Sequence, residues 1–118
     1  MTITRVLAGI AVADIEAAKR WYEKLLGKPA DDVPMASAAE WHLAAGGSIQ
    51  LSEDADRAGR GTVNLSVDDF DAALAEAAGR GIVLEEVEIP SGMFRVATTA
   101  DPEGNLVVFS QDLRRGGA

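Results

Sequence analysis

Two short stretches that share one pattern decide the fold of this chain: VADIEAA at residues 12–18 and VDDFDAA at residues 67–73. They lie 55 residues apart, and each follows an extended apolar run. The Asp at the third position of each stretch precedes a helical pattern, where a short carboxylate can accept hydrogen bonds from the free amides of the first turn. Because the period is long and only two copies occur, the pattern indicates a duplicated half-domain and not a solenoid.

Apolar spacing around these stretches predicts helices at about residues 14–26 and 69–80. Gly27 and Gly81 stand where a C-terminal cap is expected. Strict alternation of polar and apolar residues predicts a strand over residues 62–67, whose counterpart in the first half covers residues 5–12. Shorter strands are expected near residues 30–36, 38–44, 48–53, 82–89, 93–99 and 105–110.

Each half therefore reads strand, helix, strand, strand, strand, which predicts an α+β fold of two βαβββ modules. Module one covers about residues 1–58 and module two about residues 59–113 of a single domain. A frayed tail is expected over residues 114–118.

Composition excludes several classes of function. The 118 residues hold 11 Lys and Arg against 19 Asp and Glu, a net charge of −8, so the chain offers no basic patch to nucleic acid. There is no cysteine, which excludes disulfides, thiolate metal sites and a cysteine nucleophile. No apolar run approaches the ~20 residues of a membrane span. The first residues, MTITR, lack the apolar region of a secretory signal, so a cytoplasmic protein is expected.

Further motifs make the duplication recognisable. Trp21-Tyr22 precedes Leu25-Leu26-Gly27, a V-x-D sequence opens each helix, and the turn DPEGN at residues 101–105 precedes the last strand. With these motifs the chain resembles the vicinal oxygen chelate superfamily, which includes glyoxalase I, extradiol dioxygenases and bleomycin-resistance proteins. The resemblance implies sheets curled into cups that hold ligands on their concave sides. It also implies a homodimer in which modules from two chains complete each cup.

The resemblance places metal ligands on the first and last strand of each module. The corresponding positions in this chain hold Leu7, Gln50, Thr62 and Val108. Leu7 and Val108 cannot ligate a metal, and neutral oxygen donors are poor ligands for zinc or iron. We therefore expect no metal and no cofactor, and glyoxalase or dioxygenase activity is not carried over.

Other residues are candidates for ligand binding or acid–base chemistry. Glu40 and the only histidine, His42, share one face of a predicted strand, whereas Trp41 lies on the other. If the Trp41 face lines the cup, its ring can stack on a flat or cationic ligand. If the opposite face does, Glu40 and His42 could act as general acid and base. A third possibility is that Trp41 packs in the core and the other two are surface residues.

Two further features bear on the cup. Thr62, Asn64 and Ser66 form a polar stripe that is expected to line the concave side. Arg95 is the one cation on its predicted strand and could bind an anionic group or pair with a surface carboxylate.

These observations predict a metal-independent protein of the bleomycin-resistance-like kind that sequesters a small apolar or aromatic ligand. The acidic charge would suit a cationic one. The alternatives are a metal-free isomerase, cyclase or lyase that uses Glu40 and His42, and an interaction protein with a vestigial cup.

Overall fold

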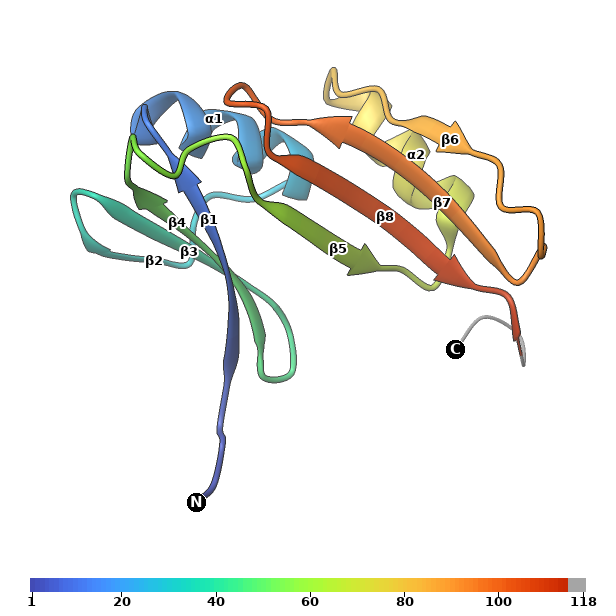
Figure 1. Ribbon diagram of the computed structural model, residues 1–118, viewed down its shortest axis with the longest axis horizontal. Helices are drawn as coiled ribbons and strands as arrows, with labels where there is room; N and C mark the ends of the chain where they lie inside the picture. Colours follow the sequence, from blue (N-terminus) through green and yellow to red (C-terminus); the bar gives the residue numbers. More distant parts are fainter. Residues whose placement is uncertain (115–118) are drawn as a thin grey trace.

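The computed structural model describes residues 1–114 and contains two four-stranded sheets, each with one helix (Figure 1). The first half forms β1 (Val6–Val12), α1 (Ile15–Leu26), β2 (Asp32–Met35), β3 (Ala38–Ala44) and β4 (Gly47–Glu53). The second half forms β5 (Thr62–Ser66), α2 (Phe70–Gly79), β6 (Glu85–Val87), β7 (Phe94–Ala100) and β8 (Leu106–Asp112). We call these halves module one and module two.

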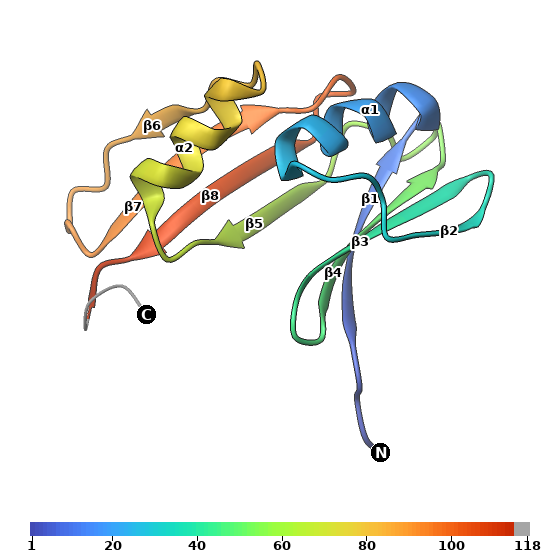
Figure 2. The same cartoon turned by 180° about the vertical axis from the view of Figure 1, so that it is seen from behind.

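The two sheets have the same topology, with strand orders β1-β4-β3-β2 and β5-β8-β7-β6. The first and last strands of each module are parallel and the other pairs are antiparallel, so both sheets are mixed. Figure 2 shows α2 lying across β7 and β8, with α1 on the same side of the molecule. The expected α+β fold of two βαβββ modules is confirmed.

The helices begin and end close to their predicted limits. The side chains of Asp14 and Asp69 accept hydrogen bonds from the amides three residues later, as N-caps do. Gly27 caps α1 in the left-handed conformation with φ of 76°. The second helix differs slightly, because Arg80 is its cap and Gly81 follows with φ of 89°. Of the tail expected over residues 114–118, residues 115–118 lie outside the described residues.

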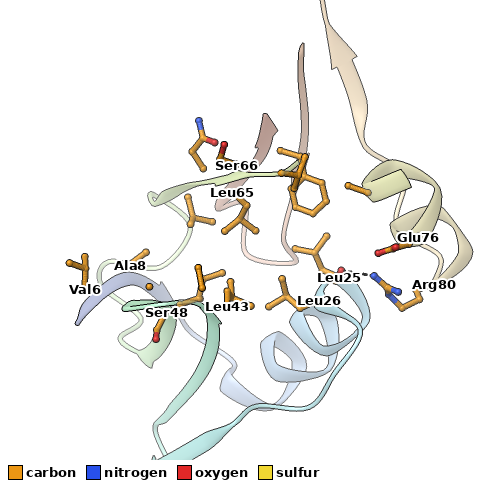
Figure 3. Close-up of a pocket in the computed structure, with 18 residues that line it drawn as sticks. Val6, Ala8, Leu25, Leu26, Leu43, Ser48, Leu65, Ser66, Glu76 and Arg80 are labelled. Atoms are coloured by element: carbon orange, nitrogen blue, oxygen red, sulfur yellow. Dashed lines mark hydrogen bonds between the residues drawn. The ribbon is translucent and has the colours of Figure 1, made fainter. Parts of the chain in front are cut away.

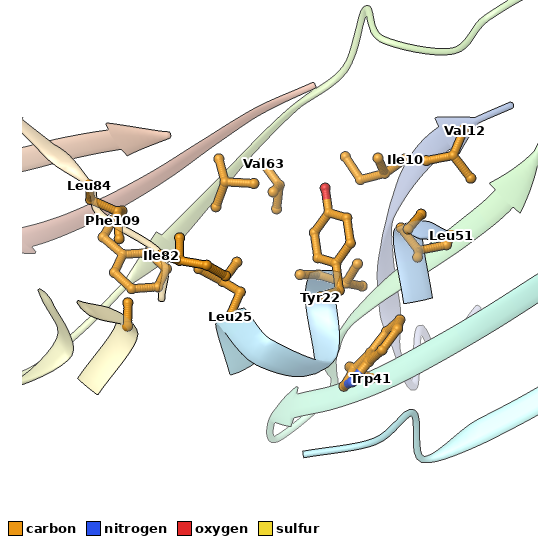
Figure 4. Packing of buried hydrophobic residues seen from close by; sticks show 14 of the residues in the cluster. Ile10, Val12, Tyr22, Leu25, Trp41, Leu51, Val63, Ile82, Leu84 and Phe109 are labelled. Atoms are coloured by element: carbon orange, nitrogen blue, oxygen red, sulfur yellow. The ribbon is translucent and has the colours of Figure 1, made fainter. Parts of the chain in front are cut away.

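One hydrophobic core runs through both modules (Figure 4). On β8 the buried residues alternate along the strand, as the strand period of two requires, with Val107 and Phe109 turned toward the core. Tyr22 and Trp41 are its largest fully buried side chains. Among the residues described, no helix is both long enough and apolar enough to span a membrane.

Hydrogen bonds from the DPEGN turn connect module two to module one. Glu103 Oε2 accepts hydrogen bonds from the backbone amides of Ala13 and Asp14, at 2.9 and 2.8 Å. The Asn105 side chain donates to the carbonyl of Ala11 at 3.0 Å. A Cβ on Gly59 would lie 2.4 Å from the backbone oxygen of Glu103, so this close approach requires glycine. The turn therefore sets the relative position of the two sheets.

Candidate functional site

Strand parity places the expected cup residues on the helix-free faces of the sheets. On β1 the helix side carries Ile10 and Val12, which are 1% and 0% exposed, so Leu7 faces the other way. Gln50 shares the helix-free side of β4, because its neighbours Ile49 and Leu51 are buried. We call the helix-free side of each sheet its cup face.

On module one the cup face carries a cluster of four polar side chains. Glu40 is 5% exposed, although it lies on this face. Its Oε2 accepts a hydrogen bond of 3.0 Å from Gln50 Nε2. Its Oε1 lies 3.4 Å from Arg5 Nη1 and 3.5 Å from His42 Nε2. Arg5 Nη1 also lies 3.2 Å from His42 Nε2, so the carboxylate, guanidinium and imidazole form a triangle.

The structure thus answers which side of β3 belongs to the cup face. It brings Glu40, His42 and Gln50 together there, and it adds Arg5, which the sequence interpretation missed. Arg5 lies 37 residues from His42 in the chain. A signal for it existed, because Arg5 is two positions before Leu7 and shares its strand parity.

On module two the cup face carries the expected polar stripe along β5. Thr62, Asn64 and Ser66 are exposed and alternate with the more buried Val63 and Leu65. Val108 of β8 lies beside Asn64 in register. The Asn64 side chain is fixed from β8, because Ser110 Oγ donates a hydrogen bond of 2.8 Å to its Oδ1. The polar stripe therefore lies on the face that the fold leaves free of helices.

Trp41 does not lie with these residues, so its expected contact with a ligand in the cup is corrected. Its side chain points to the helix side of β3 and is 0% exposed. The ring lies 6.1 Å from that of Tyr22, and its Nε1 donates a hydrogen bond of 2.9 Å to the Lys28 carbonyl. A fully buried and hydrogen-bonded indole offers no stacking surface, and the core alternative describes it.

Arg95 is also turned away from the cup face. It lies on the helix side of β7, where its guanidinium is 4.4 Å from the centre of the Phe70 ring. It donates hydrogen bonds to Asp71 at 3.0 Å and to Glu86 at 3.1 and 3.0 Å. These bonds lower the pKa of Glu86 below its ordinary value. Of the two alternatives that the sequence left open for Arg95, the structure shows the pairing with surface carboxylates.

A cavity of about 540 Å³ opens between the modules, beside α1 (Figure 3). Leu25 and Leu26 of α1 line it on one side, and Leu65 of β5 lies across from them. Of the residues expected to line the cup, Asn64 and Ser66 contribute to its lining. The lining is mainly apolar, so this cavity is distinct from the polar cluster around Glu40.

The residues present do not fit the metal that the resemblance implies. The four corresponding positions hold two aliphatic side chains, Leu7 and Val108, and two neutral ones, Gln50 and Thr62. A zinc or iron site needs several imidazole, carboxylate or thiolate ligands. Within residues 1–114, no three His, Cys, Asp or Glu side chains are grouped so that they could hold a metal ion.

Comparisons with known proteins identify the family of the chain. The family model of the Glyoxalase/Bleomycin resistance protein/Dioxygenase superfamily matches residues 2–109. The chain belongs to this superfamily. A glyoxalase/bleomycin resistance protein from Catenulispora acidiphila is 34% identical, with a TM-score of 0.84 over 90% of this chain and 96% of that one.

A second similar structure is TnmS3, described as an antibiotic binding protein from Streptomyces sp. CB03234. It is 27% identical, with a TM-score of 0.76 over 95% of this chain and 98% of that one. Among curated proteins, none matches the sequence. The superfamily and its structural neighbours thus include proteins that bind antibiotics as well as proteins named for enzymes.

Proposed function

We propose that this superfamily member is a metal-independent small-molecule-binding protein that sequesters an apolar or aromatic, cationic ligand on its cup faces. The observation that carries the proposal is the pair Leu7 and Val108 at positions where the superfamily's enzymes hold metal ligands. A bare dication beside two aliphatic side chains would keep an uncompensated charge at a large desolvation cost. These residues therefore support binding of a ligand without metal chemistry.

The ligand class follows from charge and from the similar structures. The net charge of −8 favours a cation over an anion by long-range attraction. Glu40 adds a carboxylate on the cup face itself. TnmS3, an antibiotic binding protein, has the same fold over nearly its whole length. We infer that the ligand is an antibiotic-like molecule and that its retention is a resistance function.

A homodimer belongs to this proposal, because Thr62, Asn64 and Ser66 on the cup face of module two are exposed in a single chain. Small-molecule sites usually bury 70–90% of the ligand surface, which one exposed sheet face cannot do. The chain is also somewhat expanded: its radius of gyration is 14.6 Å, against about 13.5 Å for a compact chain of this length. A second copy that sets its module two against the first copy's module one would close both cups.

The experiment is a thermal-shift screen of antibiotics, with cationic and neutral members of each chemical class. A ligand that binds only the folded protein raises its melting temperature, by an amount that grows with ligand concentration. The proposal predicts stabilisation by one class, with the ligand recovered chemically unchanged. A ligand that is converted to product, or a complete screen without any shift, would contradict sequestration.

One observation favours a second candidate, a metal-free isomerase, cyclase or lyase. Glu40 Oε1 lies 3.5 Å from His42 Nε2, so the carboxylate could orient the imidazole as a general base. In that case His42→Gln would abolish turnover but leave binding of the substrate nearly unchanged. Sequestration predicts that no turnover exists to be lost.

A further inference from the structure

The Glu40 carboxylate is unusual in its hydrogen bonding. Its Oε1 is the one buried side-chain nitrogen or oxygen, within the part of the chain that the structure describes, that has no hydrogen-bond partner. The side chain is only 7% exposed, so the carboxylate is almost wholly withdrawn from bulk solvent. Buried carboxylates normally accept several hydrogen bonds, because an ionised oxygen without a donor is costly to bury.

A guanidinium and an imidazole lie near Oε1 without donating a hydrogen bond to it. Arg5 Nη1 is 3.4 Å away and His42 Nε2 is 3.5 Å away. The Arg5 group is directed to the imidazole at 3.2 Å, so it compensates the charge of Glu40 only by proximity. The Arg5 side chain is 43% exposed and lies just before β1, so it can swing into solvent without disturbing the sheet.

We propose that Glu40 is the anchor for a guanidinium, amidinium or ammonium group of the ligand, and that Arg5 is a resident substitute which the ligand displaces. The inference rests on the proposed function and names the polar subsite within module one's cup face. A ligand N–H that enters from the cup side would complete the coordination of Oε1, and Gln50 would hold Oε2 in place at 3.0 Å. Charge-assisted hydrogen bonds of this kind are the strong ones.

The proposal predicts the sign of two mutational effects. Glu40→Gln removes the charge but keeps the shape, and should weaken binding of a guanidinium probe by about tenfold or more. Arg5→Gln removes the internal competitor and should strengthen binding by about threefold, which is the scale of a partly exposed ion pair. If Arg5 instead bound an anionic group of the ligand, its removal would weaken ligand binding.

The only histidine of the chain supplies the readout. Butylguanidinium is titrated against the full-length protein while the ¹H–¹³C signals of the His42 ring are followed by NMR. Tetramethylammonium, a cation without N–H donors, is the matched probe. Lys19→Gln is the matched variant, because Lys19 Nζ also lies 3.4 Å from a carboxylate oxygen, that of Glu16 on α1.

The expected result is a saturable shift of His42 by butylguanidinium but not by tetramethylammonium, weakened in Glu40→Gln, strengthened in Arg5→Gln and unchanged in Lys19→Gln. If Glu40→Gln does not fold, it is replaced by Glu40→Asp, which keeps the charge but has a shorter side chain. A weaker response in Arg5→Gln, or no response in either wild type or Arg5→Gln, overturns the assignment of Glu40. The antibiotic screen tests sequestration separately, so the assignment of Glu40 and the proposed function can fail independently.

Discussion

The hydroxyl of Tyr22, on the helix of module one, donates a hydrogen bond of 2.8 Å to Asp101 Oδ2, in the last turn of module two. Both residues are buried, at 0% and 4% exposure. Asp101 also accepts from the backbone amides of Glu103 and Asn105, each at 2.9 Å. The Tyr22–Asp101 pair therefore joins the helix of module one to the turn that positions module two. The turn thereby fixes how the two cup faces lie relative to each other.

Loss of this hydrogen bond should destabilise the fold without altering the cup faces. Tyr22→Phe keeps the ring in the core but withdraws a donor from a buried carboxylate, a change that costs about 1–3 kcal/mol. Urea unfolding followed by circular dichroism gives the free energy of unfolding. A variant as stable as wild type would show that the pair does not stabilise the contact between modules.

Tyr22 also makes stability depend on alkaline pH. Burial, with the neighbouring Asp101 carboxylate, raises the pKa of Tyr22 well above its ordinary value. A tyrosine in the unfolded chain ionises near pH 10, so stability is retained below that pH and decreases above it. Because Tyr22 is the only tyrosine, tyrosinate absorbance at 295 nm should appear only together with unfolding. Absorbance that rises while the fold persists would contradict this.

The expected ligand position can be tested against the cavity between the modules. Thr62→Arg places a long cation on an exposed position of the cup face and should abolish binding of a ligand found in the screen. Ala73→Trp fills the separate cavity of about 540 Å³ and should leave affinity unchanged. Arg95→Ala, on the helix side, is a second control. Calorimetry of the three folded variants measures their affinity for the ligand. Unchanged affinity in Thr62→Arg together with lost affinity in Ala73→Trp would place the ligand between the modules.

Assembly is a further expected outcome. Leu106, on the cup face of β8, is 39% exposed, and apolar groups on an open sheet favour a covering partner. Light scattering should give about twice the 12.4 kDa of one chain at micromolar concentration. A species of single-chain mass would mean that each ligand site is built from one chain alone.

Much of the fold could be predicted because its signals are local. The Asp14 and Asp69 caps, the alternation over residues 62–67 and the glycines at the turns each act within a few residues. The cup faces followed from strand parity. The site was harder, because parity alone does not say which side of β3 the helix covers. Contacts distant in sequence, such as Arg5 with His42 and Tyr22 with Asp101, depend on how the sheets pack.

The central claim is that a ligand binds to the cup faces without a metal, and one calorimetric titration tests it most directly. The untagged protein, first analysed for zinc, nickel, manganese and iron, is titrated with the ligand from the screen, with and without a strong chelator. We predict substoichiometric metal, the same affinity in both titrations and loss of binding in Thr62→Arg. Stoichiometric metal together with binding that the chelator abolishes would contradict the account.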